Sequence, residues 1–241
     1  MRKLSQEEKV NYMTTEKVPK LVCSLAVPTI ISMLVTTFYN MVDTFFVGQI
    51  NNQATAAVGV VFSVMTLIQA LGFFFGHGSG NYISRKMGER DYENAEKMAS
   101  YSFFVCFFVG IIVAVVCFIF MKPLAIILGS TKTILPYTMD YMGIILLGTP
   151  FIMSSFVLNN QLRYQGSANY AMVAIVIGAI INIGLDPLLM FVCNLGIKGA
   201  AYATIISQIT SFVILLLVSN KGQNIHISIK AFDLFFCYLS L

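Results

Sequence analysis

The sequence predicts an all-α integral membrane protein, folded as a bundle of six transmembrane helices. Of its 241 residues, 57% are hydrophobic and only 11% are charged, and the mean hydropathy is +0.80. A soluble domain covers its core with a polar shell and does not need this much apolar surface. Mostly apolar runs of about 20 residues, long enough to cross a bilayer as helices, recur along the chain. Transmembrane β-barrels show short alternating segments instead, so a barrel is excluded.

The chain is predicted to divide into three parts. Residues 1–20 are polar, carry charges of both signs and lack the apolar core of a secretory signal, so we expect a partly helical cytoplasmic tail. Residues 21–219 are predicted to form the six-helix transmembrane lobe. Residues 220–241 hold a polar loop and then a final apolar run that is too short to span. We expect this last part to be a cytoplasmic loop followed by a truncated segment.

Six spans follow one another along the lobe, and prolines modify two of them. The fourth span contains Gly148 and Pro150 near its middle, which predicts an interruption of the helix there. In the fifth span Pro187 lacks an N–H and clashes with the carbonyl of Ile183, which predicts a kink. The predicted spans are 21–47, 54–83, 98–121, 135–162, 171–193 and 200–218.

Small residues at two places predict close contact between helices, because they let two backbones approach each other. One place is the end of the second span and the other is the start of the sixth, where small residues recur four apart. These residues are Gly76, Gly78, Gly80, Gly196, Gly199, Ala200 and Ala203. Between the second and third spans, residues 85–97 are strongly charged, and the helical spacing of Glu89, Glu93 and Lys97 predicts a short surface helix.

The positions of Lys and Arg predict the topology, because cytoplasmic loops of membrane proteins carry an excess of both. With the amino terminus inside, twelve of these residues lie on the cytoplasmic side and three lie outside. We therefore expect a multi-pass protein of the plasma membrane, surrounded by lipid, with a cytoplasmic amino terminus. The twelve are Arg2, Lys3, Lys9, Lys17, Lys20, Arg85, Lys86, Arg90, Lys97, Arg163, Lys221 and Lys230; the three are Lys122, Lys132 and Lys198.

The composition argues against several classes of function. The net charge of +4 comes from basic residues scattered over loops, so no nucleic-acid partner is expected. The five cysteines lie in apolar surroundings without CxxC spacing, and His77 and His226 are far from any carboxylate cluster, so no metal centre or other cofactor is expected. No nucleophile is paired with a base, so the chain is not expected to be an enzyme.

Two aspartates inside the spans are the main candidates for function. A carboxylate in the membrane interior costs at least about 2.5 kcal/mol, and such residues usually mark a path for ions or protons. Asp186 follows Asn182 by one helical turn, which places both side chains on one helix face. Together with the carbonyl freed by Pro187, they form an oxygen-rich pocket suited to a hard cation. The alternative is that both residues are interhelical hydrogen-bonding contacts.

Side chains of three spans are predicted to converge at one depth. Asp43 lies late in the first span and Thr204 early in the sixth, at about the depth of Asp186. Two carboxylates in a dry cavity share a proton or a cation more readily than both remain bare. The predicted cation site is therefore Asp43, Asn182, Asp186 and Thr204. The alternatives are an interfacial end-cap for Asp43 and ordinary packing for Thr204.

Several segments, in order, resemble the multidrug and toxic compound extrusion (MATE) family of cation-coupled antiporters. They are FYNMVDTFFVGQI with AAVGV, GHGSGNYISRKMGERDYENAEK, LRYQGSANY, and INIGLDPLLMF with LGIKGAAYATIISQ. The resemblance covers roughly residues 20–220. It implies twelve helices in two six-helix lobes around a central cavity that opens alternately to each side. It also implies that Asp43, Asn182, Asp186 and Thr204 form the amino-terminal cation site, bordered by Tyr141 and Asn159.

The resemblance implies a sodium- or proton-coupled efflux antiporter for small molecules, typically cationic amphiphilic drugs. The coupling ion, Na⁺ or H⁺, is not distinguished, because the same oxygens serve both. The chain stops after one lobe, and its last residues do not resemble the seventh helix of the family, so we expect a second six-helix lobe to be required. The alternatives are a truncated fragment that is inert or depends on a partner, and a flippase for a lipid-linked precursor. A flippase favours a more cationic cavity than these spans provide.

Overall fold

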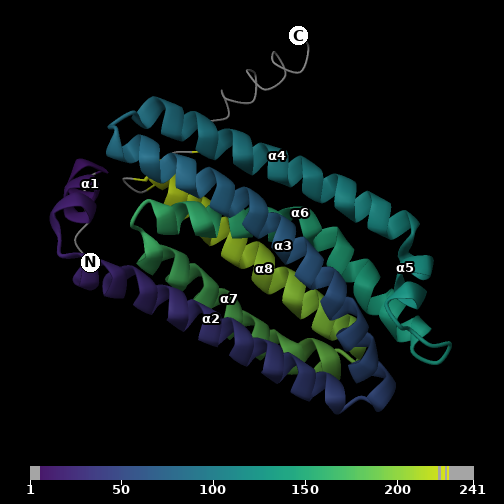
Figure 1. The fold of residues 1–241 in the computed structure, drawn as a ribbon. Helices are drawn as coiled ribbons and strands as arrows, with labels where there is room; N and C mark the ends of the chain where they lie inside the picture. The colour runs from purple at the N-terminus through teal and green to yellow at the C-terminus, as the bar shows by residue number, and fades with distance from the viewer. Residues whose placement is uncertain (1–5, 222–223, 226, 228–241) are drawn as a thin grey trace, which may run out of the picture.

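The computed structural model describes residues 6–221, 224–225 and 227, and the described secondary structure is helical. Six of the helices are long and apolar enough to cross a membrane. Figure 1 shows them running side by side, with the short α1 at one end of the bundle and α5 at the other. The helices are α1 (Gln6–Thr15), α2 (Val18–Gly48), α3 (Asn52–Gly88), α4 (Tyr92–Ile119), α5 (Met121–Ile127), α6 (Leu135–Tyr164), α7 (Ala168–Pro187) and α8 (Ile197–Lys221), with a π-helical turn, η1 (Leu188–Val192), after α7.

The centre of the bundle is α6, which packs against α3, α4 and α8. Helices α2 and α4 lie on opposite sides of the bundle, and α2 packs mainly against α7 (Figure 1). A soluble helix of this length would bury one stripe and expose a polar face. Here the outward faces of α2 and α4 expose aliphatic and aromatic side chains instead, as expected for surfaces that contact lipid.

The prediction of six transmembrane helices is confirmed, and most helices are longer than the predicted spans. The third predicted span, 98–121, corresponds to α4, which ends at Ile119; the short helix α5 that follows it was not predicted. The prediction of a separate surface helix in residues 85–97 is wrong. Those residues extend α3 and α4, because Asp91 caps α4 by accepting a hydrogen bond from the backbone N–H of Asn94 (3.3 Å). The apolar run 231–241 lies outside the described residues.

The predicted interruption of the fourth span is also wrong, because α6 is continuous through Pro150. The surroundings of this stretch explain the difference. Gly148, Thr149 and Pro150 are all buried, and an ideal Cβ on Gly110 of α4 would lie only 2.8 Å from the Cα of Pro150. Neighbouring helices therefore hold the backbone in helical geometry, although proline removes one of its hydrogen bonds.

Helix α3 contacts α6 through glycines spaced one turn apart. An ideal Cβ on Gly72 would lie 2.9 Å from Cβ of Phe156, and one on Gly76 would lie 2.9 Å from Nδ2 of Asn160. A Cβ on Gly80 would overlap the ring of Tyr164. We call these three pairs the glycine ladder. Close packing was predicted for Gly76, Gly78 and Gly80, but Gly78 has open space around it and does not contribute.

The glycine ladder leads to a matched pair of substitutions. Gly76→Val is expected to lower the free energy of unfolding by about 1–3 kcal/mol, because the new side chain overlaps Asn160 and the Phe156 carbonyl. Gly78→Val makes the same change in helix propensity on the same helix, but its side chain enters open space. It is therefore expected to change the free energy of unfolding by about 0.5 kcal/mol or less. Thermal unfolding of both purified proteins in detergent measures the difference, and equal losses would contradict the ladder.

Candidate functional site

Two carboxylates lie buried in the half of the bundle away from α1. Asp43, near the end of α2, is 7% exposed, and Asp186, near the end of α7, is fully buried. The two carboxyl groups are close enough to interact electrostatically. Because α2 and α7 pack against each other, the predicted convergence of these two side chains follows from the contact between their helices.

The cluster contains several oxygen atoms that lack hydrogen-bond partners among the described residues. Asn182 donates a hydrogen bond from Nδ2 to Oδ1 of Asp186 (3.3 Å), as expected for residues one turn apart. Oδ1 of Asn182, Oδ2 of Asp186 and Oδ1 of Asp43 are buried without a partner in the described part of the chain. A buried polar atom without a partner is costly, so such atoms in a native protein require an explanation.

Tyr141 of α6 lies in the middle of this cluster. Its ring is 1% exposed, and its hydroxyl lies beside the carboxyl group of Asp43 and the side chain of Thr204. The structure therefore brings five of the six candidate residues together from four helices. We call this group the carboxylate cluster; it comprises Asp43, Tyr141, Asn182, Asp186 and Thr204.

A second polar contact, which the sequence analysis missed, lies next to the carboxylate cluster. Gln208 donates a hydrogen bond from Nε2 to the Tyr39 hydroxyl (3.2 Å), joining α8 to α2. Tyr39 precedes Asp43 by four residues and Gln208 follows Thr204 by four, so the contact lies one turn from the cluster on both helices. This four-residue spacing was the available signal.

Tyr39 and Gln208 also line two small cavities of about 50 Å³ each beside the carboxylate cluster. Both cavities are lined by these two residues together with Thr36 and Phe156. Asn159, the sixth candidate, lines the first cavity with Asn182 and donates to the carbonyl of Ala171 (3.3 Å). Asn182 therefore borders both the cavity and the cluster. The cavity walls consist of neutral amide, hydroxyl, aromatic and aliphatic side chains.

The end of α7 gives the cluster its irregular backbone. The regular α-helix ends at Pro187, where the sequence predicts a kink, and continues as the π-turn η1. Next to it, α8 begins with small residues: Ala200 and Ala203 are fully buried, and an ideal Cβ on Gly199 would lie 2.7 Å from the Leu189 carbonyl. The close packing predicted for Gly199 is therefore confirmed, whereas the prediction for Gly196 is wrong, because an ideal Cβ there has no heavy atom within 4 Å.

The chemistry of the cluster suits a small hard cation or a proton. Carboxylate, amide and hydroxyl oxygens are the groups that bind such ions. Within the described residues there is no group of three or more His, Cys, Asp or Glu side chains that could hold a metal ion.

These features define a multi-pass membrane protein with a buried carboxylate cluster beside a neutral cavity. The family model described as MatE matches residues 28–188, more than half of the chain. The chain belongs to the MatE family of transporters, so the family resemblance seen in the sequence is confirmed.

Individual relatives agree with this assignment. The chain is 30% identical over 227 residues to the multidrug export protein MepA of Staphylococcus haemolyticus, covering 93% of this chain and 50% of the relative. It is 28% identical over 221 residues to MepA of Staphylococcus aureus, covering 91% and 49%. The chain thus spans about half the length of these curated relatives.

Solved structures show the same relationship. A MATE-family multidrug resistance transporter in an outward-facing conformation superimposes with a TM-score of 0.87 at 28% identity, covering 96% of this chain and 51% of the other. A transporter of the MOP superfamily from Pyrococcus furiosus superimposes with a TM-score of 0.86 at 30% identity, covering 96% and 51%. The binding pocket of the Pyrococcus protein is described as having reverse polarity, which suggests a different function for that transporter.

Proposed function

We propose that this chain is the amino-terminal lobe of a cation-coupled multidrug efflux antiporter and that the carboxylate cluster binds the coupling ion, Na⁺ or H⁺. The single observation that carries the proposal is the convergence of three unpartnered buried oxygens, from Asp43, Asn182 and Asp186. An ion or a proton bound there offsets the cost of burying them. MepA relatives described as multidrug export proteins support the transport role.

The arrangement of the cluster suggests how ion binding acts on the lobe. Asp43 is carried by α2, which buries only four of its side chains, whereas Asn182 and Asp186 are carried by α7. An ion shared between the two helices draws α2 toward α7, and release of the ion removes that attraction. Ion binding therefore favours positions of α2 close to α7. The size of this shift depends on how much more tightly the ion binds when the two helices are close together.

The neutral cavities beside the cluster are the proposed binding region for the transported compound. Phe156 and Tyr39 offer aromatic faces, which attract lipophilic cations, and the amides of Asn159 and Gln208 offer hydrogen-bonding groups. No Lys or Arg side chain lines either cavity among the described residues, which favours a cationic compound over an anionic lipid-linked precursor.

The orientation of the lobe in the membrane and its second half are also part of the proposed function. We propose that the α1 end of the bundle faces the cytoplasm across the plasma membrane, because the basic residues gather at that end. A second six-helix lobe completes the transporter, which agrees with relatives of twice this length. In this proposal residues 1–20 are the cytoplasmic tail, residues 21–219 the transmembrane lobe, and residues 220–241 a cytoplasmic loop and truncated segment.

The proposal is tested in the organism that makes this chain, where any partner segment is present. Strains carrying the unchanged gene, a disrupted gene and an Asp186→Asn substitution at the native locus are loaded with ethidium, a lipophilic cation. We expect the Asp186→Asn strain to accumulate as much dye as the disrupted strain. Equal accumulation in the unchanged and disrupted strains would contradict drug efflux. Normal efflux by Asp186→Asn would contradict only the cation site.

A further inference from the structure

The short helix α1 packs onto the ends of α3 and α4 and onto Ile225, which follows α8. Val10 is 5% exposed and belongs to a hydrophobic cluster with Ile83 and Met87 of α3, Ala95 and Ala99 of α4, and Ile225. Met13, one turn later, packs against the same cluster. The apolar face of α1 is therefore buried against the α3–α4 end of the bundle.

Met13 also lies against the turn between α6 and α7. Gly166, the central residue of this turn, has a φ of +74°, and an ideal Cβ there would lie 3.2 Å from Sδ of Met13. The backbone N–H of Ser167 donates to the carbonyl of Leu162 (2.8 Å), which closes the end of α6. A glycine is thus required both by the backbone conformation and by the approach of α1.

Lys9 joins three segments that are far apart in the sequence. Its ammonium group donates to Oγ of Ser167 (2.9 Å) in the α6–α7 turn and to Oδ1 of Asn224 (2.6 Å), after α8. Ser167 in turn donates to Asn224 (2.8 Å). The Lys9 side chain is buried, and burial lowers its pKa to about 8. The cost of desolvating the charge opposes these hydrogen bonds, so the contact stabilises the docked helix by less than the hydrogen bonds alone would.

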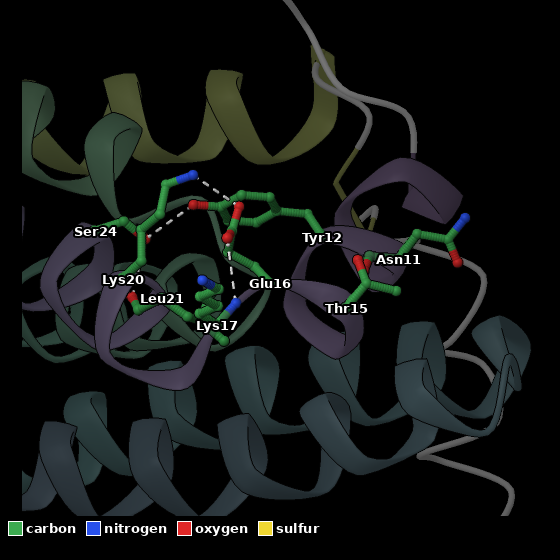
Figure 2. Close-up of polar contacts among 8 residues, drawn as sticks. All are labelled: Asn11, Tyr12, Thr15, Glu16, Lys17, Lys20, Leu21 and Ser24. Carbon is green, nitrogen blue, oxygen red and sulfur yellow. Dashed lines mark hydrogen bonds and ion pairs between the residues drawn. The ribbon is translucent and has the colours of Figure 1, made fainter.

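The other end of α1 is linked directly to α2. Figure 2 shows the Tyr12 hydroxyl pointing toward Oγ of Ser24 (3.4 Å) and Glu16 between the two helices. Glu16 accepts hydrogen bonds from the ammonium group of Lys20 (2.9 Å) and from the backbone N–H of Lys17 (3.2 Å). Of these contacts, the one between Tyr12 and Ser24 joins α1 to α2 directly, and those of Glu16 order the two-residue connection between the helices.

Much of the outer surface of the first half of α2 is exposed. Val18, Val22 and Val27 are exposed, and the first buried side chain of α2 is Pro28. A cavity of about 230 Å³ lies beneath this segment, between α1, the start of α2 and the α6–α7 turn. Helix α1 and the first half of α2 therefore both line this cavity, where Tyr12 contacts Ser24.

We propose that α1 is a clasp that fixes the first half of α2 to the α3–α4 end and the α6–α7 turn, and that α2 is freed when the clasp opens. This inference does not depend on the proposed transport activity, because it concerns only the position of α2 in this chain. The buried face of α1 closes the clasp, and the Lys9 contacts fix its register on the α6–α7 turn.

The clasp is tested by distance measurements between spin labels on the purified full chain in lipid nanodiscs. In a background with all cysteines replaced by alanine, one label pair joins Glu7→Cys to Asn169→Cys and reports on α1. A second pair joins Val22→Cys to Asn169→Cys and reports on α2. Val10→Asp places a carboxylate in the hydrophobic cluster and is expected to change both narrow distance distributions to broad ones that extend to longer distances. Asn11→Asp adds the same charge on the exposed face of α1 and is expected to leave both narrow.

Each other outcome overturns the proposal. A narrow first distribution in Val10→Asp means that this surface does not hold α1. A broad first distribution with an unchanged second one means that α1 docks without holding α2. If Val10→Asp cannot be purified, Val10→Ala is used; it removes part of the packing and is expected to broaden both distributions partially. Narrow distributions in Val10→Ala then count against the clasp.

Discussion

Asp186→Asn is expected to abolish cation-dependent stabilisation of the purified chain. An ion that binds only the folded protein raises the free energy of unfolding by RT ln(1 + [L]/Kd), about 2.7 kcal/mol at a hundred times Kd. The amide replaces a fully buried carboxylate that interacts with Asp43, so the negative charge that attracts the ion is halved. Thermal unfolding in detergent is followed while NaCl replaces choline chloride at constant ionic strength, and again as the pH is varied. The substitution is expected to remove the dependence on Na⁺ if Na⁺ is the coupling ion, or the part of the pH dependence that arises from the carboxylate cluster if H⁺ is the coupling ion.

Asp140→Asn is the matched control for this measurement. Asp140 lies on α6, one residue before Tyr141, but its carboxylate is exposed and pairs with Lys198 at 3.3 Å. The same chemical change there is expected to leave the cation dependence intact and to change stability by about 1 kcal/mol at most. Equal cation dependence in Asp186→Asn and in the unchanged chain would contradict a site at the carboxylate cluster.

Gly199→Val is expected to be the most destabilising of the substitutions considered, lowering the free energy of unfolding by about 3 kcal/mol or more. An ideal Cβ at this position would lie 2.7 Å from the backbone carbon and oxygen of Leu189 and from the backbone nitrogen of Met190. Backbone atoms cannot rotate away as a side chain can, so η1 or α8 must shift as a whole. Unfolding in detergent, followed by circular dichroism, measures the loss.

Gly184→Val provides the comparison for Gly199→Val. Gly184 lies in α7 with no heavy atom within 4 Å of an ideal Cβ, so the substitution adds the same side chain into open space. Its cost is expected to be about 0.5 kcal/mol or less. A Gly199→Val protein as stable as Gly184→Val would show that α8 does not approach η1 as closely as the structure indicates.

The fold could be predicted because hydrophobic length is a local property. Each span is a run of apolar residues, and all six were found in this way, with ends that differ by a few residues. The depth of Asp43, Asp186 and Thr204 could also be counted from the ends of their spans. Depth alone does not show which way a side chain points around its helix axis, however. The position of Tyr141 next to Asp43 and Thr204 was therefore predicted only from the family resemblance.

The features that were missed depend on contacts between distant segments. Gly148 and Pro150 predict a break when only α6 is considered, but packing against α4 and α8 keeps the helix continuous. The contact between Tyr39 and Gln208 joins residues 169 positions apart and depends on the rotation of two helices about their axes. Gly76 and Gly78 look alike in the sequence, and only the position of α6 distinguishes them.

The glycine ladder has a mechanical consequence for any motion within this lobe. Its three contacts repeat every four residues on both α3 and α6, so large side chains of α6 pack against glycines of α3 at equal intervals. Partial sliding of one helix along the other moves each large side chain off its glycine, and the next matching position lies four residues, about 6 Å, away. Helices α3 and α6 are consequently expected to move together as one rigid body. Changes of shape must be taken up by the helices around it, of which α2 is the least constrained.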